Sequence, residues 1–162
     1  MDLILALELF VMLVLANGAP VVARRLFGHH WSAPVDGGRH WRDGRPMLGK
    51  SKTWRGVVAG TLSCGLFAMV VDMGLFFGSL FGLMGLLGDM LSSFVKRRRG
   101  LAASARALWL DQIPEALLPM TLAFFWLPLG LWQAVVVVVL FTFSNIVFSP
   151  LLYRLGIRRQ PH

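Results

Sequence analysis

Residues 88–112 read GDMLSSFVKRRRGLAASARALWLDQ, and they join two apolar segments through a run of positive charge. One acid, Asp89, lies near the end of the first apolar segment, and a second, Asp111, stands just before the next one. Between them lie the cations of residues 96–99. Two carboxylates and a cationic loop, where an apolar segment meets water, indicate metal-assisted handling of a phosphate-bearing substrate.

The composition is that of a membrane protein. The chain has 162 residues, of which 56% are hydrophobic and only 15% are charged. Soluble domains carry about 25% charged residues. Apolar runs of about 20 residues recur, and each is long enough to cross the hydrocarbon core of a bilayer. We therefore predict one all-α integral membrane domain over residues 1–162. Its five transmembrane helices are expected at residues 3–23, 56–72, 74–95, 113–131 and 132–153.

The distribution of positive charge predicts the topology. All 16 Lys and Arg residues lie within residues 24–55, 96–106 and 154–159. With five spans and the N-terminus outside, the loops 24–55 and 96–112 and the C-terminus share one side, which the positive-inside rule places in the cytoplasm. We expect a multi-pass protein of the cell (inner) membrane. A nucleic-acid partner is excluded, because a basic nucleic-acid-binding surface would not alternate with membrane-length apolar runs.

Small and polar residues add detail to the predicted spans. Residues 17–20, Asn-Gly-Ala-Pro, are expected to interrupt the first helix, and residues 72–74 to form a tight turn. Glycines 74, 78, 82 and 85 share one helical face, which favours close helix packing. Asp89 continues that face and should therefore point into the bundle. Cys64, the single cysteine, excludes an intramolecular disulfide and is expected to be a packing residue.

The first loop carries residues suited to phosphate. Gly44–Ser51 matches a phosphate-binding-loop pattern, but no buried strand precedes it, so we exclude a nucleotide-hydrolase fold. The cations Lys50, Lys52 and Arg55 and the donor Thr53 can still bind phosphate. The alternative is a membrane-surface anchor attracted to anionic lipid.

The end of the third span places its polar residues together. Asp89, Ser93, Lys96 and Arg97 occupy positions i, i+4, i+7 and i+8, on one side of a helix. Mg²⁺ typically binds one or two carboxylates together with substrate phosphates, which makes Asp89 and Asp111 candidate Mg²⁺ ligands. The alternative for Asp89 is an ion pair with Lys96 or a loop arginine.

Several of these segments resemble one known family. GDMLSSFVKRR at 88–98 resembles the GD-x-x-x-S-x-x-KR element of integral-membrane cytidylyltransferases. DGRPMLGKSKTWRG at 43–56 and LDQ at 110–112 are similar to segments of CDP-archaeol synthases in particular. The AN-x-x-P of residues 16–20 and Asn145 in the last span match as well. Taken alone, Asn145 has two interpretations, a helix–helix contact or a ligand contact.

The resemblance implies a five-helix bundle with a cytoplasm-facing polar cavity. It also implies that CTP and a lipid phosphate react, with Mg²⁺, to give a CDP-lipid and pyrophosphate. Asp89 and Asp111 would hold metal, and Lys96 and Arg97 would contact phosphate. The family often has a further acid where this chain has Pro114, and the adjacent Glu115 is the candidate replacement as a metal ligand. The nucleotide would be bound by Asp36, Asp43, Gly44, Arg45, Lys52, Thr53, Arg55 and Asn145.

Other functions remain open at this stage. The lipid acceptor is an archaeal-type ether lipid or, alternatively, phosphatidate. A non-catalytic membrane scaffold that binds anionic lipid is the alternative from a different class. A homodimer is also left open. Attack by an already anionic lipid phosphate needs no general base. We further expect the spans near glycines 74–85 to pack loosely enough to open laterally and admit a lipid chain.

Overall fold

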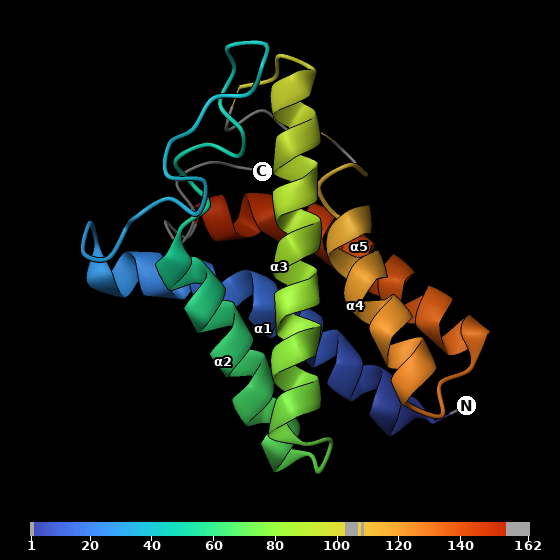
Figure 1. The fold of residues 1–162 in the computed structure, drawn as a ribbon. Coiled ribbons are helices and arrows are strands. Elements are labelled where there is room, and N and C mark those ends of the chain that lie inside the picture. The colour runs from blue at the N-terminus through green and yellow to red at the C-terminus, as the bar shows by residue number, and fades with distance from the viewer. Residues whose placement is uncertain (1, 103–106, 108, 155–162) are drawn as a thin grey trace.

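The computed structural model describes the backbone of residues 2–102, 107 and 109–154, with side chains as far as residue 147. Within these residues the chain forms helices joined by loops, with isolated β-bridges and no strand (Figure 1). The predicted all-α class is therefore confirmed. The helices are α1 (Leu3–Phe27), α2 (Trp54–Val70), α3 (Leu75–Arg98), α4 (Ile113–Trp126) and α5 (Leu131–Arg154).

The helix bounds differ most from the predicted spans at three helix ends. The fourth predicted segment, 113–131, stops being helical at Trp126, because Leu127 precedes Pro128 and takes an extended conformation (φ −114°, ψ 159°). The third, 74–95, continues to Arg98, since cations in a last turn interact favourably with the helix dipole. The first, 3–23, continues to Phe27 before Gly28 ends it with φ 54°.

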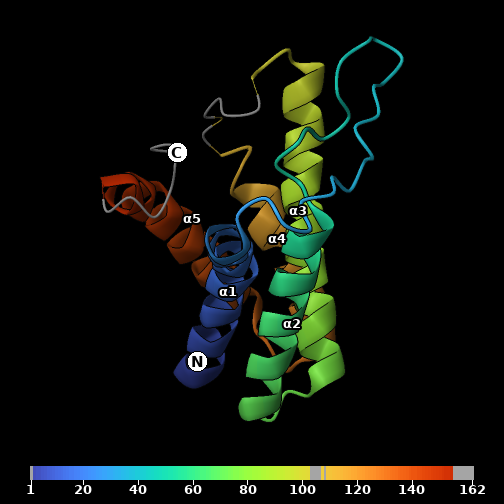
Figure 2. The same cartoon turned by 90° about the vertical axis from the view of Figure 1, so that its left-hand side faces the viewer.

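The expected interruption of the first helix is a bend within one continuous helix. Pro20 lies inside α1, where it removes a backbone hydrogen bond. Figures 1 and 2 show the consequence, because the part of α1 after the bend lies across the direction of α2 and α3. Pro20 also packs on α2, since a Cβ built at Gly56 would lie 3.3 Å from the Pro20 Cβ.

Helix α3 is the centre of the bundle and contacts α1, α2 and α4. Its glycine face is closed tightly. A Cβ at Gly78 would lie 2.5 Å from the Cys64 carbonyl oxygen, and one at Gly82 would lie 3.0 Å from that of Gly60. Cys64 is buried in this contact, as expected. The expectation of loose packing and lateral opening here is therefore wrong, and Gly74 belongs to the turn before α3 (φ 86°) instead of to this face.

The outer surface of the bundle is apolar. Large hydrophobic side chains are exposed on every helix, among them Ile4, Val70, Phe76, Phe125 and Trp132. A soluble monomer rarely shows so much contiguous apolar surface. By length and composition, α1 and α3 can each cross a membrane, while α2, α4 and the described part of α5 (131–147) are shorter apolar helices.

Candidate active site at the carboxyl end of α3

The last turns of α3 hold a cluster of polar side chains. Ser92 and Ser93 are buried there, and the Ser92 hydroxyl donates to the Gly88 carbonyl oxygen at 2.9 Å, which satisfies it within the helix. Asp89 and Lys96 lie seven positions apart and so occupy the same side of α3. Both side chains are partly exposed. This end of α3 can therefore present charge to a ligand.

Asp89 forms an ion pair with the first loop. The Lys52 Nζ lies 2.5 Å from Asp89 Oδ2, and the two side chains are 19% and 31% exposed. Lys52 is held in place because its carbonyl oxygen accepts from Val35 N–H at 2.8 Å and because the next residue, Thr53, is the N-cap of α2. The alternative expectation for Asp89 named Lys96 or a loop arginine as partner; an ion pair exists, but its cation is Lys52.

Lys96 instead pairs with the second acid. Its Nζ lies 2.7 Å from Asp111 Oδ1, while Asp111 Oδ2 accepts a hydrogen bond from Ala107 N–H at 3.1 Å. The side chain of Asp111 is 27% exposed. The structure thus gives each of the two predicted acids a lysine partner at the same end of α3.

The start of α4 brings Glu115 to the same region. A Cβ at Gly88 would lie 2.1 Å from the Pro114 carbonyl oxygen and 2.7 Å from the Glu115 Cα, so the α4 backbone touches α3 beside Asp89. Glu115 is buried. Over residues 2–102, 107 and 109–147, no three acid, imidazole or thiol side chains form a group able to hold a metal.

Asp36 organises the first loop from within. Its Oδ2 accepts from the N–H groups of Leu48 (2.9 Å) and Gly49 (3.2 Å), and its Oδ1 accepts from Gly38 N–H (2.9 Å). Partial burial raises the pKa of Asp36, but these hydrogen bonds outweigh it and hold the pKa below its ordinary value. The family resemblance implies a nucleotide contact at Asp36, and within the chain its carboxylate closes the loop.

Asp43, Gly44 and Arg45 fasten the loop to the end of α3. Asp43 pairs with Arg98, and the Arg45 Nη1 donates to the Arg98 carbonyl oxygen at 2.8 Å. Desolvation raises the pKa of Asp43, but the Arg45 N–H and the Arg98 guanidinium together hold it below its ordinary value. Gly44 supports the turn with φ 74°. Sequence reasoning missed Arg98, because nothing distinguishes it from its neighbours in a run of arginines.

A small basic pocket lies between this loop and α3. Its volume is about 220 Å³, and its lining is Arg45, Pro46, Arg97, Gly100 and Leu101. Arg97 is buried, and its Nη2 donates to the Ala102 carbonyl oxygen at 2.9 Å. Two guanidinium groups facing one pocket can bind phosphate oxygens.

Two of the remaining predicted nucleotide contacts hold α2 in place, and the third lies on α5. Thr53 caps α2 by accepting from Gly56 N–H at 3.3 Å. The Arg55 Nη1 donates to the carbonyl oxygens of Gly28 (3.1 Å) and His30 (2.6 Å), tying α2 to the end of α1. Asn145 lies on α5, which packs against α1 and α4 and, within the described residues, does not contact α3.

Comparison with known proteins decides the family. The profile of the CarS-like family, described as CDP-archaeol synthase, matches residues 1–76 and 67–162. The chain belongs to this family. The resemblance found in the sequence is thus confirmed.

Two relatives and one solved structure are informative. The CDP-archaeol synthase of Thermococcus kodakarensis is 33% identical over 160 residues, which cover 90% of this chain and 88% of the relative. That of Hyperthermus butylicus is 40% identical over 104 residues, 60% of this chain and 59% of the relative's length. A solved intramembrane enzyme for archaeal membrane lipid biosynthesis is 30% identical, with a TM-score of 0.71 over 88% of this chain and 90% of that chain. With its apolar surface, this chain is therefore a membrane protein of the same fold.

Proposed function

We propose that this protein transfers the cytidylyl group of CTP to an archaeal-type ether-lipid phosphate, forming CDP-archaeol or a close analogue and pyrophosphate. Membership of the CDP-archaeol synthase family supports the reaction. The observation that carries it is the pair of carboxylate–lysine contacts, Asp89 with Lys52 and Asp111 with Lys96, at one end of α3. Such a transfer requires carboxylates that bind a metal ion and cationic side chains that bind phosphate.

The reaction is a displacement at the α-phosphorus of CTP. An oxygen of the lipid phosphate forms a bond to that phosphorus, the bond to the β-phosphate bridging oxygen breaks, and pyrophosphate leaves. The attacking oxygen is already anionic, so the residues need only orient the reactants and stabilise the developing charge. Lys52 and Lys96 can provide positive charge beside the acids, and Arg45 and Arg97 can provide it in the basic pocket.

Asp89 and Asp111 would hold Mg²⁺, with Glu115 as a further oxygen donor at the start of α4. The donor set fits, because two partly exposed carboxylates leave room for substrate phosphates in the coordination shell. When bound, Mg²⁺ would neutralise phosphate oxygens and stabilise the leaving pyrophosphate. Asp36, Asp43, Thr53 and Arg55 would act indirectly, by shaping the loop that presents Lys52.

The proposal includes a topology. The five helices cross the cell membrane as a single domain with the N-terminus outside, so that the active site and both basic loops face the cytoplasm. The confinement of every Lys and Arg to three stretches supports this orientation. The 17 residues of α2 and 14 of α4 rise only about 25 and 21 Å, so both would lie in locally thinned membrane.

The test is transfer of label from CTP into lipid. Detergent-purified protein is incubated with Mg²⁺, CTP labelled in its α-phosphate, and either a di-isoprenoid glycerol phosphate or phosphatidate. Label in the lipid that depends on Mg²⁺ and is lost in Asp89→Asn is expected. Asp72→Asn is the matched control, because Asp72 is exposed in the turn at the opposite end of α3.

Each outcome separates the candidate functions. A preference for phosphatidate would reassign the acceptor to diacyl lipid. No label with either lipid, from folded protein that binds CTP, would point to a different acceptor. Folded protein that neither binds CTP nor transfers label would be a non-catalytic lipid-binding scaffold, and the proposed function would be wrong.

A further inference from the structure

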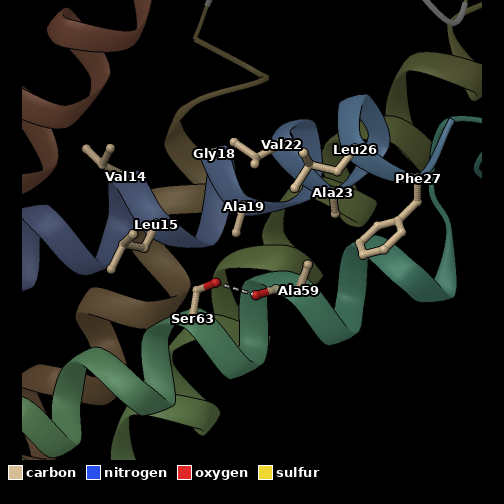
Figure 3. Close-up of a pocket in the computed structure, with 10 residues that line it drawn as sticks. All are labelled: Val14, Leu15, Gly18, Ala19, Val22, Ala23, Leu26, Phe27, Ala59 and Ser63. Atoms are coloured by element: carbon tan, nitrogen blue, oxygen red, sulfur yellow. Dashed lines mark hydrogen bonds between the residues drawn. The ribbon is translucent and has the colours of Figure 1, made fainter.

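An apolar groove of about 430 Å³ lies between α1 and α2, outside the acid–lysine cluster (Figure 3). One wall is α2, through Ala59 and Ser63. The other wall is α1, whose main contributions are Val14, Leu15, Ala19, Val22, Leu26 and Phe27. Its size is within the range of small-molecule sites, which is about 300–1,000 Å³.

The side chains that line the groove offer a ligand no free hydrogen-bond donor. Ser63 contributes the hydroxyl that lines the groove, and this hydroxyl donates to the Ala59 carbonyl oxygen of its own helix at 2.7 Å, as Figure 3 shows. At Gly18, which also lines the groove, a Cβ would meet nothing within 4 Å, so there is room for a side chain. A surface with its polar atoms satisfied internally suits a hydrocarbon chain, which brings no hydrogen-bonding groups.

The groove opens to the outside of the bundle, and two cations lie in the last turns of α1. Val22 and Leu26 are more than half exposed, although they line the groove. Arg24 and Arg25 are exposed in the same turn of α1. An apolar groove with positive charge near one end is complementary to an anionic lipid, whose hydrocarbon chain and headgroup match the two parts.

The groove also ends near the acid–lysine cluster. Ala59 lies five residues into α2 from Trp54, a rise of about 7.5 Å along the helix axis, and Lys52 precedes Trp54 by two residues. The contacts of Arg55 with the Gly28 and His30 carbonyl oxygens hold the end of α1 beside the start of α2. A lipid with its chain in the groove could therefore have its headgroup at the Lys52 end of α2.

We propose that this groove binds one hydrocarbon chain of the lipid phosphate acceptor, with the phosphate directed toward Lys52 and Asp89. The inference rests on the proposed function and deepens it. The chain enters along the flank between α1 and α2, which the bend at Pro20 shapes, and not along the tightly packed glycine face of α3.

Filling the groove tests the inference. Gly18→Leu and Ser63→Leu place side chains in the groove, and Thr121→Leu is the matched control. Thr121, like Ser63, donates its hydroxyl to the carbonyl oxygen four residues earlier, at 2.8 Å, but it is exposed on α4.

The measurement is kcat/KM for a long-chain isoprenoid glycerol phosphate divided by that for a short-chain analogue. Losing the burial of two methylene groups should lower this ratio about tenfold in both groove variants and leave it unchanged in Thr121→Leu. Equal ratios in all three would overturn the inference.

A binding readout separates this inference from the proposed reaction. Protein in vesicles of zwitterionic phospholipid is photolabelled with a lipid phosphate that carries a diazirine at its chain end. We expect label on peptides of α1 and α2, removed by excess unlabelled lipid phosphate but not by excess zwitterionic lipid, and reduced in Gly18→Leu. Equal labelling by a zwitterionic probe would show that bulk lipid fills the groove and would contradict the inference. Selective labelling by protein that transfers no cytidylyl group would contradict the reaction alone.

Discussion

Lys52 and Asp89 are 37 positions apart in the sequence, yet their Nζ and Oδ2 atoms lie 2.5 Å apart. The contact joins the first loop to α3, and its carboxylate, Asp89, is one of the two candidate Mg²⁺ ligands predicted from the sequence. The lysine is therefore placed where it can reach the same phosphate oxygens that a cation on Asp89 would contact. The charge of Lys52, more than its packing, should therefore matter for activity.

Replacing Lys52 should impair transfer selectively. In Lys52→Gln we expect kcat/KM for CTP to fall about 100-fold or more, because one charged contact to the transferred phosphate is lost. Lys50→Gln is the control, since Lys50 is exposed two residues earlier in the same loop. Steady-state label transfer measures both. If the two variants lose activity equally, Lys52 contributes only to the net charge of the loop.

Asp111 should determine how much Mg²⁺ the enzyme needs. Asp111→Asn keeps the size of the side chain but weakens its contact with Lys96 and removes a charged oxygen donor. We expect the Mg²⁺ concentration for half-maximal activity to rise about tenfold or more, while the thermal midpoint changes little. A Mg²⁺ titration of activity, together with Mn²⁺ binding measured by electron paramagnetic resonance, checks this. An unchanged metal requirement would remove Asp111 from the proposed metal site.

The sequence was a good guide to positions along one helix and a poor guide to partners across the fold. The i, i+4, i+7 spacing correctly placed Asp89 and Lys96 on the same side of α3, because helical geometry is local. The partner of Asp89 depends on how residues 28–53 fold over the bundle, and hydrophobic periodicity carries no information about that. The end of α4 was locally predictable, since the residue before Pro128 disfavours helix.

The contacts of Asp36 also depend on how the first loop folds. Family resemblance groups it with nucleotide contacts, but only the folded loop reveals that three N–H groups converge on its carboxylate. A short acidic residue among glycines indicates a turn at most, and the closing contacts to Leu48 and Gly49 come from a distant part of the loop.

The loop should be sensitive to acid through Asp36. Its pKa in the folded loop is below the ordinary value of 3.8, so its contribution to stability is fully present above that pH and is lost as pH falls through the lower, folded-state pKa. We expect the amides of Leu48 and Gly49 to lose hydrogen-exchange protection below pH 3.8, after correction for intrinsic exchange. Asp36→Asn should lose much of that protection at neutral pH, and Asp72→Asn should not. Equal protection in Asp36→Asn and wild type would show that the loop is held by other contacts.

The contact between α3 and α4 should be the least tolerant of added volume. In Gly88→Ala the new methyl group would meet the Pro114 carbonyl oxygen at 2.1 Å, and backbone cannot move aside as a side chain can. Relieving the overlap requires α4 to shift, at a cost of about 1–3 kcal/mol. Because α4 carries Glu115 and follows Asp111 directly, the shift should lower activity as well as the unfolding temperature.

Gly18→Ala provides the matched comparison, since a Cβ there meets nothing within 4 Å. Alanine favours a helix over glycine by about 1 kcal/mol, so this variant should unfold at or above the wild-type temperature. Thermal unfolding in detergent, followed by circular dichroism, measures both variants. If Gly88→Ala and Gly18→Ala unfold at the same temperature, α3 and α4 can move apart at no cost in stability. The fold would then not fix the close approach of Glu115 to Asp89.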